Sequence, residues 1–188
     1  MADSILSSRR LFTGWLNLLL LRVHLGGREE DRPVIEHPSG SAVLVYDPAR
    51  RVALTVRQTR TPVLMLDHPC LAEPVAGVAE DESAADTARR EAEEEVGVRL
   101  REVEKVGLAW MTPSSSTECV HLFLAEYAQG DRVSEGGGAP DENEQLDVRE
   151  EALSALWAEV ESGATTDAKL LLLLQALRIR RPDLFEPA

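Results

Sequence analysis

The chain has 188 residues, with 33 acidic and 20 basic side chains and a formal net charge of −13. This length suits one globular domain with a small appendage, and it is enough to bury a sizeable core. The acidic balance excludes a non-specific nucleic-acid-binding protein, because such a protein needs a basic surface to neutralise phosphates.

The amino-terminal segment resembles a signal peptide only superficially. Two arginines open the stretch 9–23, but its uninterrupted apolar run, residues 18–21, is short, and Arg22 follows directly. A membrane-spanning helix needs about 20 apolar residues, and no small-residue cleavage site is present. Cys70 and Cys119 lack metal-type spacing, which favours two buried or half-buried thiols in a reducing compartment. We therefore expect a soluble cytoplasmic protein with no membrane partner.

The first third of the chain is rich in strand patterns. Residues 11–24 mix Leu, Val, Trp and Phe with Arg and predict one strand, and residues 26–31 predict a polar turn. Residues 41–46 and 52–57 are apolar and β-branched, which is typical of strands. The Asp-Pro-Ala-Arg connection at 47–50 is short, so these two strands are expected to form a hairpin.

The middle of the chain holds the strongest helix pattern. Residues 61–70 predict a proline-containing loop, and residues 73–77 predict a short strand that ends at glycine. Residues 83–96 are rich in Ala, Glu and Arg. Ser83 can cap the start of this helix and Gly97 can end it.

The last third predicts further strands followed by helices. A long loop at 129–143 contains three consecutive glycines, and loops of this length are usually functional or disordered. No internal repeat is present. The β-rich pattern with one central helix and carboxy-terminal helices predicts an α+β fold in an α/β/α sandwich. The elements expected here are strands 103–111, 119–127 and 146–148 and helices 150–162 and 167–180.

Three carboxylates share one face of the helix at 83–96. On a helical wheel, Glu91, Glu94 and Glu95 fall in one narrow sector. Like charges at this spacing destabilise a helix, and Arg90 can pair with Glu94 but cannot neutralise all three. Mg²⁺ prefers carboxylate oxygens together with substrate phosphates. The pattern therefore indicates a metal site, with an acidic solvated helix face as the alternative.

The acidic helix belongs to a longer motif that resembles the Nudix box. That box reads Gly, five residues, Glu, seven residues, then Arg-Glu-aliphatic-any-Glu-Glu-any-Gly-aliphatic. Here Gly77 is followed by Glu82 after four residues, and the segment from Arg90 to Val98 matches the second half. Ala92 takes the aliphatic position, and the first half is one residue shorter than the family pattern.

Flanking segments resemble the branch of ADP-ribose pyrophosphatases and GDP-mannose hydrolases, so that the resemblance covers most of the chain. Serines at 114–116 replace glycines of the family pattern. The matching segments are Gln58–Arg60, Glu73–Gly77, Thr112–Glu118, Gly136–Glu144 and Asp167–Lys169.

The resemblance implies a Nudix fold with a mixed central β-sheet, a catalytic box helix and a small amino-terminal β-sheet used for dimerisation. Residues 1–37 would form the amino-terminal strands and residues 38–188 the hydrolase domain. In this family the small sheet swaps across a homodimer, and the apolar stretch 15–23 favours such a partner.

The resemblance also implies roles for individual residues. Glu91, Glu95, Glu144 and the backbone carbonyl of Ala76 would hold Mg²⁺, with Mn²⁺ as a substitute. Glu142 would be the general base, and Glu94 a second catalytic carboxylate that binds metal or orients water. The residues alone do not distinguish Asp141, Glu142 and Glu144 as the base. The implied substrate-binding residues are Arg32 (from the partner subunit), Arg60, Gly77, Glu118 and Lys169.

The function implied is Mg²⁺-dependent hydrolysis of the pyrophosphate bond of a nucleoside diphosphate linked to a sugar, of the ADP-ribose or GDP-mannose type. The products would be a nucleoside monophosphate and a sugar phosphate. A catalytically weak nucleotide sensor with the same fold is the alternative, and an acidic interaction domain without chemistry is the third reading. The repulsive glutamate cluster favours catalysis.

Overall fold

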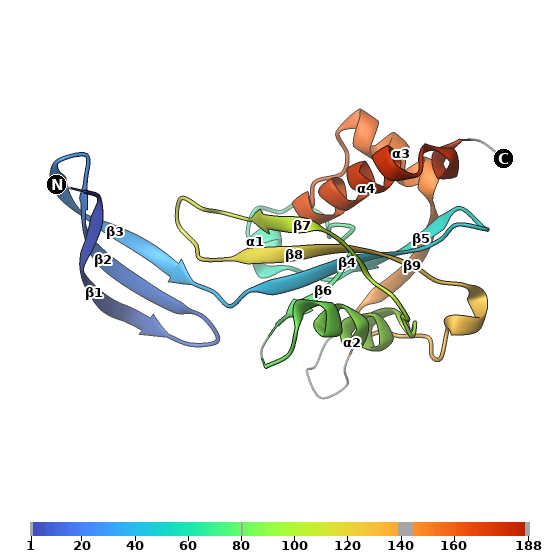
Figure 1. The fold of residues 1–188 in the computed structure, drawn as a ribbon, viewed down its shortest axis with the longest axis horizontal. Coiled ribbons are helices and arrows are strands. Elements are labelled where there is room, and N and C mark those ends of the chain that lie inside the picture. The colour runs from blue at the N-terminus through green and yellow to red at the C-terminus, as the bar shows by residue number, and fades with distance from the viewer. Residues whose placement is uncertain (1, 80, 139–144, 187–188) are drawn as a thin grey trace.

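The computed structural model describes residues 2–79, 81–138 and 145–186 and contains two β-sheets (Figure 1). The small sheet is antiparallel in the order β1-β2-β3, and the main sheet has the order β7-β8-β4-β5-β9, with β6 paired to β4. Strands β4 and β8 run parallel, whereas the other pairs in the main sheet are antiparallel. The strands of the small sheet are β1 (Ser4–Thr13), β2 (Asn17–Leu25) and β3 (Arg28–Glu36).

Helices cover both faces of the main sheet (Figure 1). Helix α2 packs on one face, and α3 and α4 lie on the other, so the expected three-layer α+β fold with a mixed sheet is confirmed. The strands are β4 (Gly40–Asp47), β5 (Val52–Arg57), β6 (Val75–Val78), β7 (Glu104–Trp110), β8 (Cys119–Glu126) and β9 (Asp147–Ala152). The helices are α1 (Thr61–Leu64), α2 (Ala84–Val96), α3 (Leu153–Ser162) and α4 (Ala168–Arg180), with 3₁₀ turns at Gln129–Asp131 and Pro182–Phe185.

Strand β4 is buried along its whole length and divides the core in two. Because successive side chains of a strand point to opposite faces, Leu44 packs among the leucines of α3 and α4, and Val43 and Val45 pack against α2. The strand therefore anchors both helical layers, which places the ends of α2 and α4 near the same sheet.

Helix α2 forms where the sequence predicts it. The Ser83 side chain accepts a hydrogen bond from the Asp86 backbone N–H, and Gly97 adopts the left-handed conformation that ends the helix. Ala88, Ala92 and Val96 are buried against the sheet. These small side chains let the helix lie close to β6, which brings its glutamates to the edge of the sheet.

The single strand predicted for residues 11–24 is wrong. The chain turns at 14–16, where the Gly14 N–H donates to the Leu16 carbonyl, and two strands flank this turn. The polar turn predicted for 26–31 is confined to the two glycines at its start, and β3 follows. The acidic residues Glu29 and Asp31 fit into β3 because Arg22 of the neighbouring strand β2 forms ion pairs with both.

Two further predictions are corrected by long-range contacts. The helix predicted from residue 150 begins at Leu153, because Glu150 and Glu151 extend β9 and pair with Arg50 and Arg57 on the neighbouring hairpin. The strand predicted at 146–148 is correspondingly longer.

The prediction of two buried or half-buried thiols is wrong for one cysteine. Cys70 is exposed, whereas Cys119 is half-buried.

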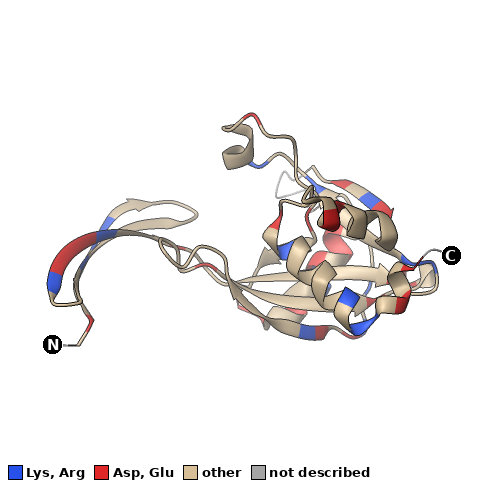
Figure 2. Cartoon of the chain, turned by 90° about the horizontal axis from the view of Figure 1, so that it is seen from above, with Lys and Arg blue, Asp and Glu red and all other residues tan. Residues whose placement is uncertain are grey.

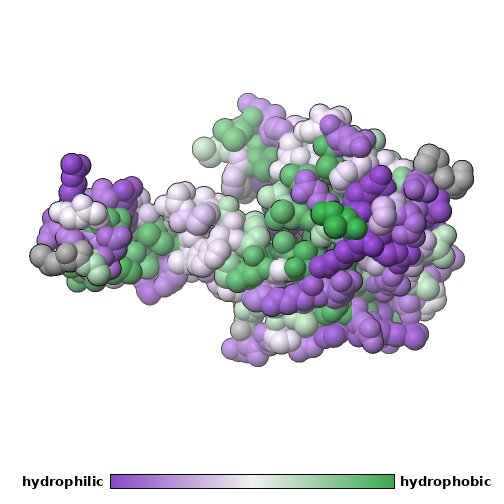
Figure 3. Space-filling view, turned by 45° about the horizontal axis from the view of Figure 1, so that its top comes forward, coloured by the Kyte–Doolittle hydropathy of each residue, from purple (hydrophilic) through white to green (hydrophobic). Residues whose placement is uncertain are grey.

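The small sheet extends away from the main body (Figures 1 and 2). Its contact with the body runs through the β7–β8 loop, where the Ile35 N–H donates to the Ser115 carbonyl at 2.7 Å and the Thr117 N–H donates to the Ile35 carbonyl. Strand β1 is exposed throughout, and apolar surface is visible on the small sheet and beside its junction with the body (Figure 3). The apolar side chains concerned include Ile5, Leu6, Leu11, Phe12 and Trp15.

Among the residues that the structure describes, no helix combines the length and apolar character needed to span a membrane.

Candidate active site

A cavity of about 1380 Å³ lies where the two sheets, α1, α2 and the start of α4 meet. Acidic residues enter it from α2, and basic residues enter it from the segment before α1 and from the first turn of α4. The cavity brings together most of the site residues predicted from sequence: Arg60, Ala76, Gly77, Glu91, Glu95, Glu118 and Lys169.

Two glutamates of α2 are held tightly against strand β6. Glu95 is 2 % exposed, and its Oε2 accepts a hydrogen bond from the Ala76 backbone N–H at 3.2 Å. The Glu91 side chain lies directly over Gly77, since a Cβ on that glycine would come within 1.7 Å of Glu91 Oε1. Only glycine permits this approach, so the glycine that opens the box motif makes room for the carboxylate.

Arg90 forms ion pairs with three acids of the motif. Its guanidinium contacts Glu82 at 2.9 Å, Glu91 at 2.9 Å and Glu94 at 2.7 Å. Burial lowers the pKa of Arg90, but the hydrogen bond to Glu82 and the charges of Glu91 and Glu94 outweigh it, so that the pKa is raised. Glu82 thus still reaches the helix although the box loop is one residue short. The positively charged Arg90 guanidinium pairs with all three carboxylates.

Glu94 does not line the cavity, although the helical wheel places it in the same sector as Glu91 and Glu95. Its carboxylate is about one-third exposed and bonds to Arg90. Arg32 also lies outside the cavity, on β3, where it pairs with Glu30 at 2.7 Å. A role for Arg32 in the cavity of another subunit stays a prediction.

A buried carboxylate organises the basic side of the cavity. Glu73 accepts two hydrogen bonds from Arg60, at 2.8 and 2.9 Å. Lys169 lies 3.7 Å from Glu73 and 2.6 Å from Asp167. Glu73 and Asp167 both line the cavity, but neither belongs to the site residues predicted from sequence.

The predicted loop acids Glu142 and Glu144, together with Asp141, lie outside the described residues. The described residues on either side of them are fixed to the end of α2. The Gly137 N–H donates to the Glu95 carbonyl at 2.8 Å, and the Leu146 N–H donates to the Gly137 carbonyl at 3.3 Å. Gly136 has a positive φ, and a Cβ there would come within 2.4 Å of the Glu95 carbonyl oxygen. The glycine run therefore serves close packing on the helix that carries the glutamates.

Trp15 and His37 are cavity residues that the sequence analysis missed. Trp15 is 78 % exposed, and its ring meets the His37 ring edge-on, with 5.3 Å between centroids. Both lie at the ends of small-sheet strands. An aromatic residue directly after a turn glycine was the available signal, but it was hidden by treating residues 11–24 as one strand.

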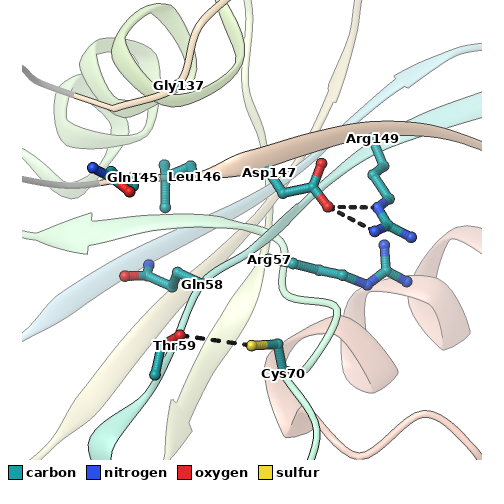
Figure 4. A pocket seen from close by; sticks show the side chains of 9 residues that line it. All are labelled: Arg57, Gln58, Thr59, Cys70, Gly137, Gln145, Leu146, Asp147 and Arg149. Carbon is teal, nitrogen blue, oxygen red and sulfur yellow. Dashed lines mark hydrogen bonds and ion pairs between the residues drawn. The ribbon is translucent and has the colours of Figure 1, made fainter.

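A second cavity, of about 660 Å³, lies beside the first, and Thr59 lines both (Figure 4). Arg57 and Arg149 face it from neighbouring strands. Each guanidinium has an acidic partner, Glu151 for Arg57 and Asp147 for Arg149. These ion pairs match the charges within this wall. The residues of the box motif line the larger cavity instead, which makes that cavity the better candidate site.

The donor chemistry of the larger cavity fits a hard divalent cation. Glu91 and Glu95 supply carboxylate oxygens, and the backbone at Ala76 and Gly77 lies in contact with both. No group of three His, Cys, Asp or Glu side chains in metal-binding geometry occurs within residues 2–79, 81–138 and 145–186. A Mg²⁺ ion that keeps several waters needs only one or two protein carboxylates, so the pair on α2 suffices for the fit.

The fold and the motif agree with known proteins. Residues 36–174 match the model of the NUDIX domain. The GDP-mannose pyrophosphatase of Cronobacter sakazakii is 37 % identical over 151 residues, covering 79 % of this chain and 78 % of that protein. The Pectobacterium atrosepticum protein of the same name is 34 % identical over 163 residues, covering 86 % and 83 %.

Among solved structures, an ADP compounds hydrolase superposes with a TM-score of 0.77 over 97 % of this chain and 96 % of its own, at 16 % identity. At that identity the likeness concerns the fold, including the small amino-terminal sheet. Because the domain model covers most of the chain and the box residues line one cavity, the chain belongs to the Nudix family of hydrolases.

Proposed function

We propose that the chain hydrolyses the pyrophosphate bond of a nucleoside diphosphate linked to a sugar, with GDP-mannose and ADP-ribose as the candidate substrates. The observation that carries the proposal is a single cavity lined by Glu91 and Glu95 of α2 and by Arg60 and Lys169 from two other segments. The names of the relatives, GDP-mannose pyrophosphatase and ADP compounds hydrolase, support this substrate class. The products would be a nucleoside monophosphate and a sugar phosphate.

In the proposed site, Glu91, Glu95 and the Ala76 carbonyl would hold Mg²⁺ or Mn²⁺. Bound there, the cation would supply positive charge against the pyrophosphate and acidify water. The protein's own contribution is to fix the two carboxylates, through the Ala76 N–H and the Gly77 surface. Arg90 holds Glu91 and Glu94 in place through ion pairs of 2.9 and 2.7 Å.

The proposed general base is Glu142, and Glu144 is the proposed further metal ligand. Hydrolysis adds water across the P–O–P linkage, and a positioned carboxylate takes the proton that the attacking water loses. The backbone bonds from Gly137 and Gly138 to the last turn of α2 support this assignment. They hold Gly137 and Gly138 beside the helix that carries Glu95.

A substrate screen tests the proposal. The purified chain is incubated with GDP-mannose, ADP-ribose, UDP-glucose, NADH and diadenosine polyphosphates, with Mg²⁺ or Mn²⁺, and products are measured after treatment with phosphatase. We expect turnover of a nucleoside diphosphate sugar and no turnover in EDTA. Tight binding of a nucleotide sugar without turnover would instead support the nucleotide sensor, and neither binding nor turnover would contradict both readings.

We also propose that the chain is a homodimer built through the amino-terminal strands, with residues 1–37 as the dimerisation unit and Arg32 reaching the partner's cavity. The exposed apolar side chains of β1, including Ile5, Leu6 and Phe12, have no cover within the described part of one subunit. A strand without a buried face contributes little to its own stability, which favours a partner.

The dimer leads to a direct prediction. Light scattering of the intact chain should give twice the monomer mass, and changing Ile5 and Phe12 together to serine should give a monomer, because the substitutions remove exposed apolar surface. Changing the exposed Ile179 of α4 to serine is the matched control, since it alters a similar surface far along the chain. A monomeric wild-type chain at micromolar concentration contradicts the proposal.

A further inference from the structure

Glu73 is one of the most buried charged side chains among the described residues, and it lies in the cavity wall. Its side chain is 4 % exposed. Its backbone is fixed as well, because Glu73 and Val56 exchange two N–H to carbonyl hydrogen bonds of 2.9 Å. A buried carboxylate is costly unless it is paired, so the partners of Glu73 explain its position.

Arg60 meets Glu73 side-on. Its Nε donates to Oε1 at 2.8 Å and its Nη2 donates to Oε2 at 2.9 Å. Two parallel bonds fix the plane of a guanidinium, not only its distance from the carboxylate. Arg60 is nevertheless 41 % exposed and lines the cavity. Glu73 thus holds one edge of the guanidinium while the side chain stays accessible from the cavity.

Lys169 is held by the same carboxylate from another element. Its Nζ lies 3.7 Å from Glu73 and 2.6 Å from Asp167, and it is 19 % exposed. Asp167 in turn caps α4 by accepting a hydrogen bond from the Leu170 N–H at 2.8 Å. Two cations and two carboxylates from three separate segments therefore form one balanced network at the cavity wall.

We propose that Glu73 is a positioning residue: it sets the direction of Arg60 and Lys169, so that they bind the part of the substrate distant from Glu91 and Glu95. The inference rests on the proposed function and names a determinant of substrate affinity in the same site. Glu73 does so without touching the substrate, because its oxygens are engaged with the two cations. The network lets two like charges lie side by side in the cavity, which their mutual repulsion would otherwise oppose.

Glu73→Gln removes the charge and keeps the shape. The substitution turns one carboxylate oxygen into an NH2 group that only donates, so the side chain cannot accept the two parallel Arg60 bonds, which go to different oxygens. The guanidinium and the ammonium then lose their fixed orientation. Because they hold a part of the substrate that does not react, the loss falls on binding that the ground state and the transition state share. We expect KM to rise about 10-fold and kcat to change by less than about 3-fold.

The experiment compares Glu73→Gln and Glu73→Asp in the wild type with Glu73→Gln in a chain that also carries Arg60→Ala and Lys169→Ala. The proposal requires that Glu73→Asp, which keeps the charge, falls between wild type and Glu73→Gln in KM. It also requires that Glu73→Gln changes KM by less than about 2-fold once both cations are gone, since interactions through shared partners are not additive.

Asp47→Asn is the matched control. Asp47 is a buried carboxylate paired with Arg50 at 2.7 Å, but it does not line the cavity. This variant should lower the melting temperature and leave KM unchanged. If Glu73→Gln behaves as the control does, or still raises KM about 10-fold in the chain without both cations, the proposal is overturned.

Failure of the proposed function can be distinguished from failure of the positioning role. If the wild type does not turn over any nucleotide sugar, titration calorimetry with GDP-mannose in EDTA measures binding alone. A dissociation constant about 10-fold weaker for Glu73→Gln than for wild type then supports the positioning role in a non-catalytic site. Equal constants overturn it, and absence of both turnover and binding in the wild type overturns both proposals.

Discussion

Replacing Glu95 with glutamine should lower kcat by at least about 100-fold, without unfolding the protein. The amide has the shape of the carboxylate and can still accept a hydrogen bond from the Ala76 N–H, so the packing of α2 on β6 is kept. It lacks the negative charge that the proposed metal site requires. The measurement is steady-state turnover of the substrate found in the screen, at increasing Mg²⁺ concentrations.

Glu93→Gln is the control for this variant. Glu93 lies on the same helix two residues away, but it points to solvent and pairs with Arg99 at 2.8 Å. It does not line the cavity. We expect its activity within about 2-fold of wild type, since exposed ion pairs contribute little. Full activity of the Glu95 variant would show that the reaction does not need the Glu95 carboxylate, and it would contradict the proposed metal-binding role.

Replacing Gly77 with alanine should have an effect of similar size for a steric reason. The added Cβ would lie 1.7 Å from Oε1 and 2.1 Å from the carboxyl carbon of Glu91. The Glu91 side chain must move, because β6 is held by its pairing with β4. A displacement of about 1 Å at a reacting centre can cost about 100-fold in rate. We expect kcat to fall about 100-fold or more while circular dichroism shows a folded protein.

Gly107→Ala is its matched control. Gly107 is also a strand glycine, but nothing lies within 4 Å of the Cβ position, so the substitution should be silent. Adding Glu91→Gln to the Gly77 variant should produce little further loss, since both changes act on one side chain. Wild-type activity of Gly77→Ala, or equal losses from both glycine variants, would contradict the steric explanation.

The elements that the sequence predicts correctly are those whose information is local. Ser83, the alanine face and Gly97 define α2 from start to end, because caps and helical periodicity depend on residues a few positions apart. The hairpin of β4 and β5 follows from two apolar runs and a tight turn. The box motif identifies the family for the same reason, since its fixed spacings lie within one loop and one helix.

The elements that the sequence misplaces depend on distant partners. Strand β1 has no buried face, so no alternation marks it, and its pairing with β2 is visible only in the folded chain. Strand β9 extends to residue 152 because Arg50 and Arg57 neutralise its glutamates across the sheet. Cross-strand partners can override local propensity.

For the site, the sequence by itself determined the acidic motif on which the proposed metal site depends: a helix with three clustered glutamates inside a Nudix box. Only the tertiary structure decided which of them face the cavity. Glu91 and Glu95 do so, because Gly77 and the Ala76 N–H receive them, whereas Glu94 is held outside by Arg90. A wheel gives directions around one axis, but the packing of the helix on β6 selects among them.

The ion pairing on the basic side of the cavity was decided by the fold. Arg60 and Lys169 are recognisable as candidates from sequence, but their common carboxylate, Glu73, lies on a third segment. Burial makes that pairing obligatory, because an unpaired carboxylate in the cavity wall would be strongly destabilising. The sequence determined which charged groups are available, and the long-range packing of β5, β6 and α4 decided which of them meet.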